Sequence, residues 1–145
     1  DVLEIVLGDE QLMSDLFTTS EIALGTLGLA YHPEQDDNRR KLDVVVGGLG
    51  LGYTAEAVLC DKSVGSLWVV EALQAIIDWH VSGLLPLGEI LCADPRCKFV
   101  CSDFFASARK NVGFDATQPG RRFDAILVDI DHAPNFHLAP ENAGF

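Results

Sequence analysis

Three acidic residues and a cluster of glycines form the part of this sequence that could do chemistry. Glu71, Asp103 and Asp129 each closely follow a short apolar run rich in β-branched or aromatic residues. The glycines follow a fourth such run, at Gly47, Gly48, Gly50 and Gly52. Carboxylates accept hydrogen bonds from hydroxyl, amino and ammonium groups. Glycines have no Cβ, so a ligand can come close to the backbone. The set predicts a site for a nucleoside and a cationic substrate.

The spacing of the glycines separates this site from two common nucleotide-binding motifs. A dinucleotide fingerprint, G-x-G-x-x-G, that began at Gly48 would need a third glycine where Tyr53 stands. The turn also lacks the Lys-Ser/Thr ending of a phosphate loop. Both departures argue against NAD and ATP and leave a nucleoside ligand without a pyrophosphate. For the glycines alone, a tight turn that binds nothing is the alternative.

Alternating strands and helices are predicted to position these residues. The predicted strands are Val44–Val46, Ser66–Val70, Lys98–Cys101 and Phe123–Val128. The predicted helices are Tyr53–Cys60, Leu73–His80 and Phe104–Asn111. This alternation is typical of an α/β fold with a parallel sheet, whose ligands bind at the carboxyl ends of the strands. Glu71 follows the glycines by about 20 residues, the separation at which an acid meets a ribose hydroxyl.

The amino-terminal part of the chain has a different pattern. Val2–Leu7 and Gln11–Ser14 are predicted to form a β-hairpin around a Gly-Asp-Glu turn. Thr18 with Glu21 fits a capping box ahead of the helical run Ile22–Leu29. We therefore divide the chain into a hairpin region, residues 1–17, and a nucleoside-binding domain, residues 18–145. The segment between residues 83 and 91 is expected to be irregular, with room for a helical turn.

The composition of the chain limits the classes of partner that it can bind and the cellular compartment in which we expect it. The net charge of −12 argues against nucleic acid and anionic membranes as partners and is compatible with a cationic substrate. No apolar run approaches the ~20 residues of a membrane span, and no secretion signal is visible. The four cysteines lack paired C-x-x-C spacing, which is typical of a reduced, cytoplasmic protein.

The order of these motifs resembles that of a known family. A glycine-rich turn is followed by an acid in Val69–Ala72, an aspartate in Ser102–Phe104, and the run FDAILVD in Phe123–Asp129. This order is similar to that of the S-adenosylmethionine-dependent methyltransferase superfamily, and within it to the spermidine synthases, the polyamine aminopropyltransferases. The resemblance implies a Rossmann-like class I methyltransferase fold, preceded by a small hairpin. The fold would be truncated, because the superfamily's further strands are absent, and its exposed edge strand would make a homodimer possible.

The resemblance also implies roles for the candidate residues. Glu71 would hold the ribose hydroxyls of S-adenosylmethionine or its decarboxylated form, and Asp103 would accept a hydrogen bond from the adenine amino group. The glycine turn, Gly47 to Gly52, would pass beneath the nucleoside. Asp129 would face the transferred group and an amine such as putrescine, with methylthioadenosine as the product. Glu71→Gln is expected to weaken binding of the cofactor with little effect on folding, because the acid would face a cleft.

Two positions depart from the spermidine synthase pattern. The family's glycine loop reads G-G-G-D-G-G, and its aspartate, which binds the amine of the aminopropyl group, is replaced here by Gly50. In the family's D-S-x-D-P motif the second aspartate is the base, and here His132 takes that place with Asp131 one residue earlier. Either residue could take a proton from an amine. Methyl transfer and a catalytically silent nucleoside-binding domain are the alternatives.

A metal site is a further alternative that the sequence raises. Its candidate ligands are Asp129, Asp131, His132 and His137. These ligand types suit a divalent metal, but chemistry at a sulfonium needs none. We therefore expect no metal.

Overall fold

The computed structural model describes residues 2–30, 40–109 and 113–130 of the chain. The described chain begins with an antiparallel hairpin, β1 (Glu4–Leu7) and β2 (Glu10–Ser14), which turns at Gly8 and leads into helix α1 (Thr19–Ala30). Ile5 is buried in the main apolar core, and Met13 packs against that core. The hairpin therefore packs on the rest of the described chain, and the division at residue 17 stays a prediction.

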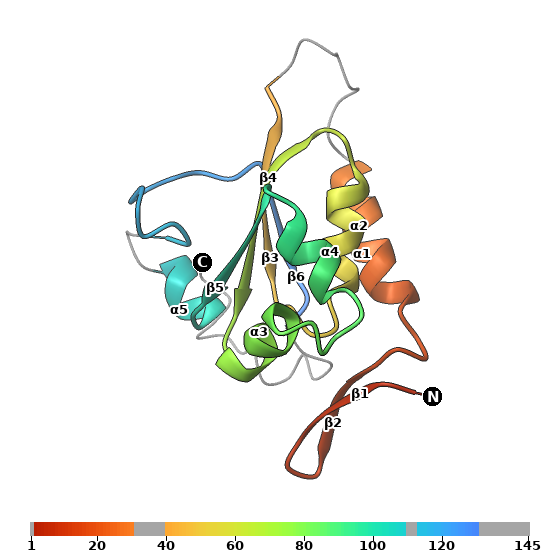
Figure 1. The fold of residues 1–145 in the computed structure, drawn as a ribbon. Helices are drawn as coiled ribbons and strands as arrows, with labels where there is room; N and C mark the ends of the chain where they lie inside the picture. The colour runs from red at the N-terminus through yellow and green to blue at the C-terminus, as the bar shows by residue number, and fades with distance from the viewer. Residues whose placement is uncertain (1, 31–39, 110–112, 131–145) are drawn as a thin grey trace.

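A parallel sheet of four strands forms the centre of the molecule (Figure 1). Its strands are β3 (Leu42–Gly47), β4 (Val64–Glu71), β5 (Cys97–Cys101) and β6 (Ala125–Val128). They lie in the order β5-β4-β3-β6, and every pairing is parallel. The helices between them are α2 (Tyr53–Cys60), α3 (Gln74–Val81), α4 (Gly88–Ala93) and α5 (Phe104–Arg109). The predicted fold class, a Rossmann-like sheet with flanking helices after a hairpin, is confirmed.

Strand β3 is apolar throughout because it is buried on both faces. Its valines alternate between two clusters, Val44 and Val46 in one and Val45 in the other, and all three have 0% exposure. The first cluster packs under α1, α2, α3 and α4, and the second packs under the aromatic residues of α5 and Phe114. Figure 1 shows α1, α2 and α4 on one side of the sheet and α5 on the other.

Helix α4 begins inside the segment that was expected to be irregular with a helical turn, and it continues beyond that segment to Ala93. The sequence did not predict the full helix, because Pro86 and Gly88 are residues that ordinarily interrupt a helical pattern. Gly88 is needed here for packing, since a Cβ at this position would overlap the carbonyl group of His80 in the preceding helix. None of the helices in the described ranges is long and apolar enough to cross a membrane.

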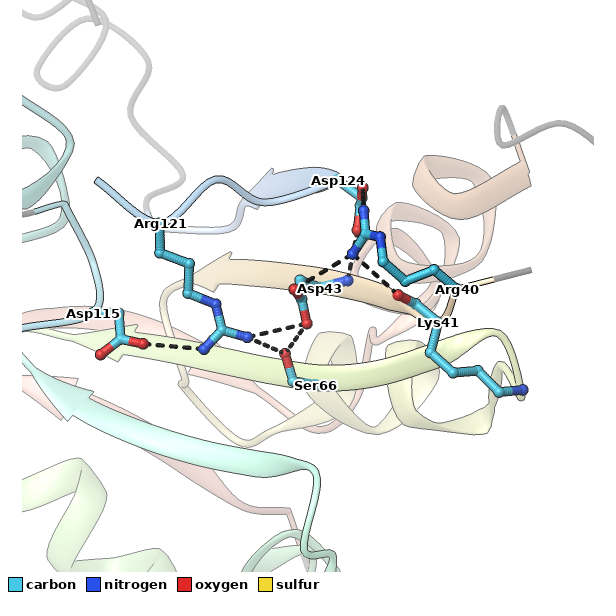
Figure 2. A network of polar contacts seen from close by, with 7 residues as sticks. All are labelled: Arg40, Lys41, Asp43, Ser66, Asp115, Arg121 and Asp124. Atoms are coloured by element: carbon cyan, nitrogen blue, oxygen red, sulfur yellow. Dashed lines mark hydrogen bonds and ion pairs between the residues drawn. The ribbon is translucent and has the colours of Figure 1, made fainter. Parts of the chain in front are cut away.

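A network of ion pairs and hydrogen bonds between side chains joins the amino-terminal ends of the strands, at the end of the sheet opposite to the glycine turn (Figure 2). Arg121 bridges Asp43 in β3 at 3.1 Å and Asp115 at 3.0 Å. Asp115 is only 1% exposed. Its burial acts to raise the pKa of the carboxyl, but hydrogen bonds from Thr117 and Arg121 outweigh this and hold the pKa below its ordinary value. The network thus aligns β3, β4 and β6 at one end and leaves the other end for a site.

Candidate functional site

The carboxyl ends of the strands are joined by hydrogen bonds that continue the sheet ladder past the last paired residues. These bonds run from Gly48 N to Val70 O (2.8 Å), from Ser102 N to Glu71 O (2.9 Å) and from Asp129 N to Gly47 O (2.7 Å). The structure therefore brings the glycine turn and the acids at 71, 103 and 129 to one edge of the sheet, as the order of the motifs predicted.

The strand order places a topological switch point at this edge. From β3 the chain adds β4 and then β5 on one side, and β6 returns to the other side of β3. Ligands of open α/β sheets bind at such a switch point, outside the carboxyl ends of the two strands where the order reverses. The glycine turn follows β3 and Asp129 follows β6, so both border the switch point.

The turn itself requires glycine at three of its positions. Gly48, Gly50 and Gly52 have φ values of 92°, 49° and 97°, in the left-handed region that favours glycine. A Cβ on Gly48 would overlap the carbonyl oxygen of Asp129, and one on Gly52 would lie 2.7 Å from Leu91 Cδ1. The turn therefore passes directly against its neighbours, with no side chain between them.

Glu71, at the end of β4, forms a hydrogen bond with the backbone of this turn. Its Oε2 accepts a hydrogen bond from Leu49 N at 2.9 Å, and its Oε1 accepts one from Leu73 N at 2.8 Å. The residue is 7% exposed, so the expectation that it faces an open cleft is wrong, and its two hydrogen bonds argue against the small effect on folding that was expected of Glu71→Gln. A single sequence cannot show this, because the two amides come from different loops. Each oxygen still has a second lone pair with which to accept a ligand hydroxyl.

Two residues that the sequence did not single out also contact the turn. Met13 Sδ accepts a hydrogen bond from Leu51 N at 3.2 Å, and His80 Nε2 lies 2.9 Å from Gly50 O. Both partners are backbone atoms of glycine-turn residues, and the contacts link β2 and α3 to the turn. The signal for His80 was its position among the apolar residues of a helical face.

Asp129 turns toward α2. Its Oδ2 lies 2.5 Å from the hydroxyl of Thr54, which is 3% exposed and also lies 3.2 Å from the carbonyl of Glu21. Burial raises the pKa of the Asp129 carboxyl, the bond from Thr54 opposes this, and the charge of Glu21 adds to it, so the pKa lies above its ordinary value. A half-buried carboxyl with a raised pKa is suited to take up a proton from a substrate.

The remaining candidate residues divide into one that is described and two that are not. Asp103 is exposed and caps α5, because its Oδ1 accepts a hydrogen bond from Ala106 N at 2.8 Å. Asp131 and His132 lie outside the described residues, as does His137. Among the residues that are described, no group of three or more His, Cys, Asp or Glu side chains could hold a metal ion.

We predict that Gly48→Ala destabilises the fold by about 3 kcal/mol, because the new Cβ combines a left-handed φ with a backbone overlap. Gly83→Ala is the matched control. Gly83 has a similar φ of 73° but nothing within 4 Å of its Cβ position, so only about 1 kcal/mol of backbone strain is expected. Urea unfolding measures both free energies. Equal losses would show that the turn does not press on Asp129.

We predict that Asp129→Asn stabilises the fold at pH 7. The raised pKa means that the folded state binds the proton more tightly than the unfolded chain, so ionisation of Asp129 costs stability as the pH rises through the folded pKa. Asparagine does not ionise, and its Oδ1 can still accept the bond from Thr54. Thermal unfolding between pH 3 and 8 should show an advantage that disappears as the pH falls toward about 4. A variant less stable than the parent at pH 7 would contradict this.

The chain was compared with protein families, curated proteins and solved structures. No protein-family model and no curated protein sequence matches the chain. Solved structures do match it, and two of them are spermidine synthases. The first is spermidine synthase from Thermotoga maritima, with a TM-score of 0.63 and 21% identity, over 85% of this chain and 38% of that one. The second is a spermidine synthase in complex with the transition state analogue AdoDATO, with a TM-score of 0.64 and 21% identity, over 86% of this chain and 37% of that one.

These similarities bear on the fold and on its extent. The chain spans less than two fifths of the length of either spermidine synthase. At 21% identity the likeness concerns the arrangement of the elements, over 85–86% of this chain. The resemblance predicted from the motifs is therefore confirmed at the level of the fold, which is an α/β fold similar to that of the two spermidine synthase structures.

Proposed function

We propose that this chain binds S-adenosylmethionine or its decarboxylated form and transfers a group from its sulfonium centre to an amine such as putrescine. The observation that carries the proposal is the position of Glu71, which ends β4 and contacts the glycine turn after β3. An acid in that position of a βαβ unit accepts the hydroxyls of a ribose. The similar spermidine synthase that was solved with AdoDATO supports the same ligand class.

The residues at the edge of the sheet fit such a nucleoside. A carboxylate offers about four lone-pair sites, so Glu71 has acceptor capacity left after binding Leu49 and Leu73. Asp103 uses one oxygen to cap α5 and can accept an adenine amino group with the other. The turn lacks a Lys and the third fingerprint glycine, which suits a ligand without a pyrophosphate. The product would be methylthioadenosine, and no metal is required.

The reaction would be a displacement at the carbon bonded to sulfur. The lone pair of a neutral amine forms the new C–N bond while the C–S electron pair leaves with the sulfur, which becomes an uncharged thioether. The amine must lose a proton, and we propose that Asp129, whose pKa is raised by burial, accepts it. We propose Asp131 or His132 as the alternative base. The strongly acidic chain would attract the cationic amine, and we propose that the protein acts in the cytoplasm.

Methyl transfer is the second candidate, and one contact favours it. The spermidine synthase pattern has an aspartate where this chain has Gly50. Here the space next to Gly50 is taken by Met13, whose Sδ lies 2.6 Å from the position that a Cβ would occupy. An apolar thioether in that place offers no charge to the amine of an aminopropyl group.

Calorimetric titration with the two forms of the cofactor separates these candidates. Aminopropyl transfer predicts tighter binding of decarboxylated S-adenosylmethionine and formation of a polyamine when putrescine is added. Tighter binding of the carboxylated form would instead favour methyl transfer. Binding of either form without any turnover would indicate a silent nucleoside-binding domain. No binding of either form, or of methylthioadenosine, would reject the proposal as a whole.

We predict that Glu71→Gln weakens the binding of methylthioadenosine by at least about tenfold, since a charge-assisted bond to a hydroxyl contributes about 1.5–3 kcal/mol. The substitution also sets an amide NH₂ against a backbone N–H, so the free energy of unfolding should fall by about 1–3 kcal/mol. Glu89→Gln is the control, because it removes the same charge from an exposed position on α4. If Glu71→Gln lowers stability but leaves the affinity unchanged, Glu71 is only structural and the site lies elsewhere.

A further inference from the structure

His80 is buried directly beside the glycine turn. The residue is 1% exposed and projects from α3, with its Nε2 at 2.9 Å from Gly50 O. Its ring lies 5.9 Å from that of Phe99 in β5, and its Cε1 lies 3.1 Å from the position that a Cβ on Gly52 would occupy. The imidazole therefore fills the space between α3, β5 and the turn.

The hydrogen-bond partners of the ring define its protonation. Gly50 O can only accept, so Nε2 must carry the proton and donate. Nδ1 is buried and has no hydrogen-bond partner among the residues that the structure describes. A second proton on Nδ1 would be a buried donor without an acceptor, which is costly. In this geometry the ring is therefore neutral, with its proton on Nε2.

The bond from His80 fixes one end of a single peptide group. The carbonyl of that group belongs to Gly50 and accepts from His80, and its N–H belongs to Leu51 and donates to Met13 Sδ at 3.2 Å. Gly50 has a φ of 49°, and a glycine backbone moves easily between left- and right-handed conformations. Without a partner for its carbonyl, this peptide group could rotate and change the surface that the turn presents to a ligand.

We propose that His80 is a positioning residue, which holds the Gly50–Leu51 peptide in the orientation that binds the nucleoside and does so only as a neutral imidazole. The inference rests on the proposed function for the identity of the ligand. His80 itself lies between α3, β5 and the turn, and its side chain would not contact the ligand.

The charges around His80 give the direction of its pH dependence. Burial lowers the pKa of His80, and the bond to Gly50 and the negative charge of Glu71 at the end of β4 oppose this without cancelling it. Glu71 is the charged side chain that acts on the ring in the described chain. The pKa of His80 in the folded protein lies below the ordinary value of about 6.5. A state in which the turn has moved away from His80, or in which the chain is unfolded, therefore takes up the proton first as the pH falls. The turn conformation that His80 holds thus loses stability below about pH 6.5.

Two substitutions test the proposal. Glutamine can place an uncharged N–H donor near the position of Nε2 but cannot titrate, and phenylalanine fills the same space without a donor. Methylthioadenosine is titrated calorimetrically into the parent chain, His80→Gln and His80→Phe at several values between pH 5.5 and 7.5. Acids elsewhere in the site titrate alike in all three proteins, so the difference between the parent and His80→Gln isolates the imidazole.

At pH 7.5 we expect His80→Gln to bind like the parent and His80→Phe to bind about three- to tenfold more weakly, the factor that one net hydrogen bond provides. Toward pH 5.5 the affinity of the parent should fall several-fold more than that of His80→Gln. Parallel pH profiles for the parent and His80→Gln, or normal affinity in His80→Phe, would overturn the proposal.

A readout without ligand separates this inference from the proposed function. Amide hydrogen exchange of residues 49–52 reports the opening of the turn whether or not methylthioadenosine binds. Protection of these amides should be similar in the parent and His80→Gln at pH 7.5, and lower in His80→Phe. If no nucleoside binds at any pH, the proposed function fails, and equal protection in all three proteins would overturn the role of His80 independently.

Discussion

The glycine turn satisfies only part of its own backbone, and much of the structure around it follows from that constraint. Gly52 N donates to Leu49 O within the turn, but three other backbone groups of the turn find partners in other elements. Glu71 from β4 accepts the Leu49 amide, Met13 from β2 accepts the Leu51 amide, and His80 from α3 donates to the Gly50 carbonyl. The turn is thus a point where a hairpin, a strand and a helix meet, and small displacements of any of them would reach the site.

The two ends of the sheet carry different kinds of polar groups. At the amino-terminal ends, arginine and aspartate side chains neutralise each other around Arg121 (Figure 2). At the carboxyl ends the carboxylates of Glu71, Asp103 and Asp129 receive hydrogen bonds from amide and hydroxyl groups. No arginine or lysine forms an ion pair with these three acids within residues 2–30, 40–109 and 113–130. Their negative charge therefore remains available to a cation.

The fold could be predicted from the sequence because its signals are local. Unbroken apolar runs predicted strands buried on both faces, and the helical periodicity between them predicted a parallel sheet. The candidate acids could be placed at one edge for the same reason. The contacts of Met13, His80 and Thr54 could not be predicted, since each joins segments far apart in the chain. The burial of Glu71 was missed because its partner amides belong to two separate loops.

The position of β6 has a consequence for the order of folding. This strand pairs with β3, and contacts such as the one between Asp43 and Asp124 close a loop of 81 residues. The pairing of β3 with β4 needs a much shorter loop, so its entropic cost of closure is lower. A partly folded chain could therefore form the glycine turn and the Glu71 contact before Asp129 arrives. The switch point would be completed last, when β6, the final described strand, docks against β3.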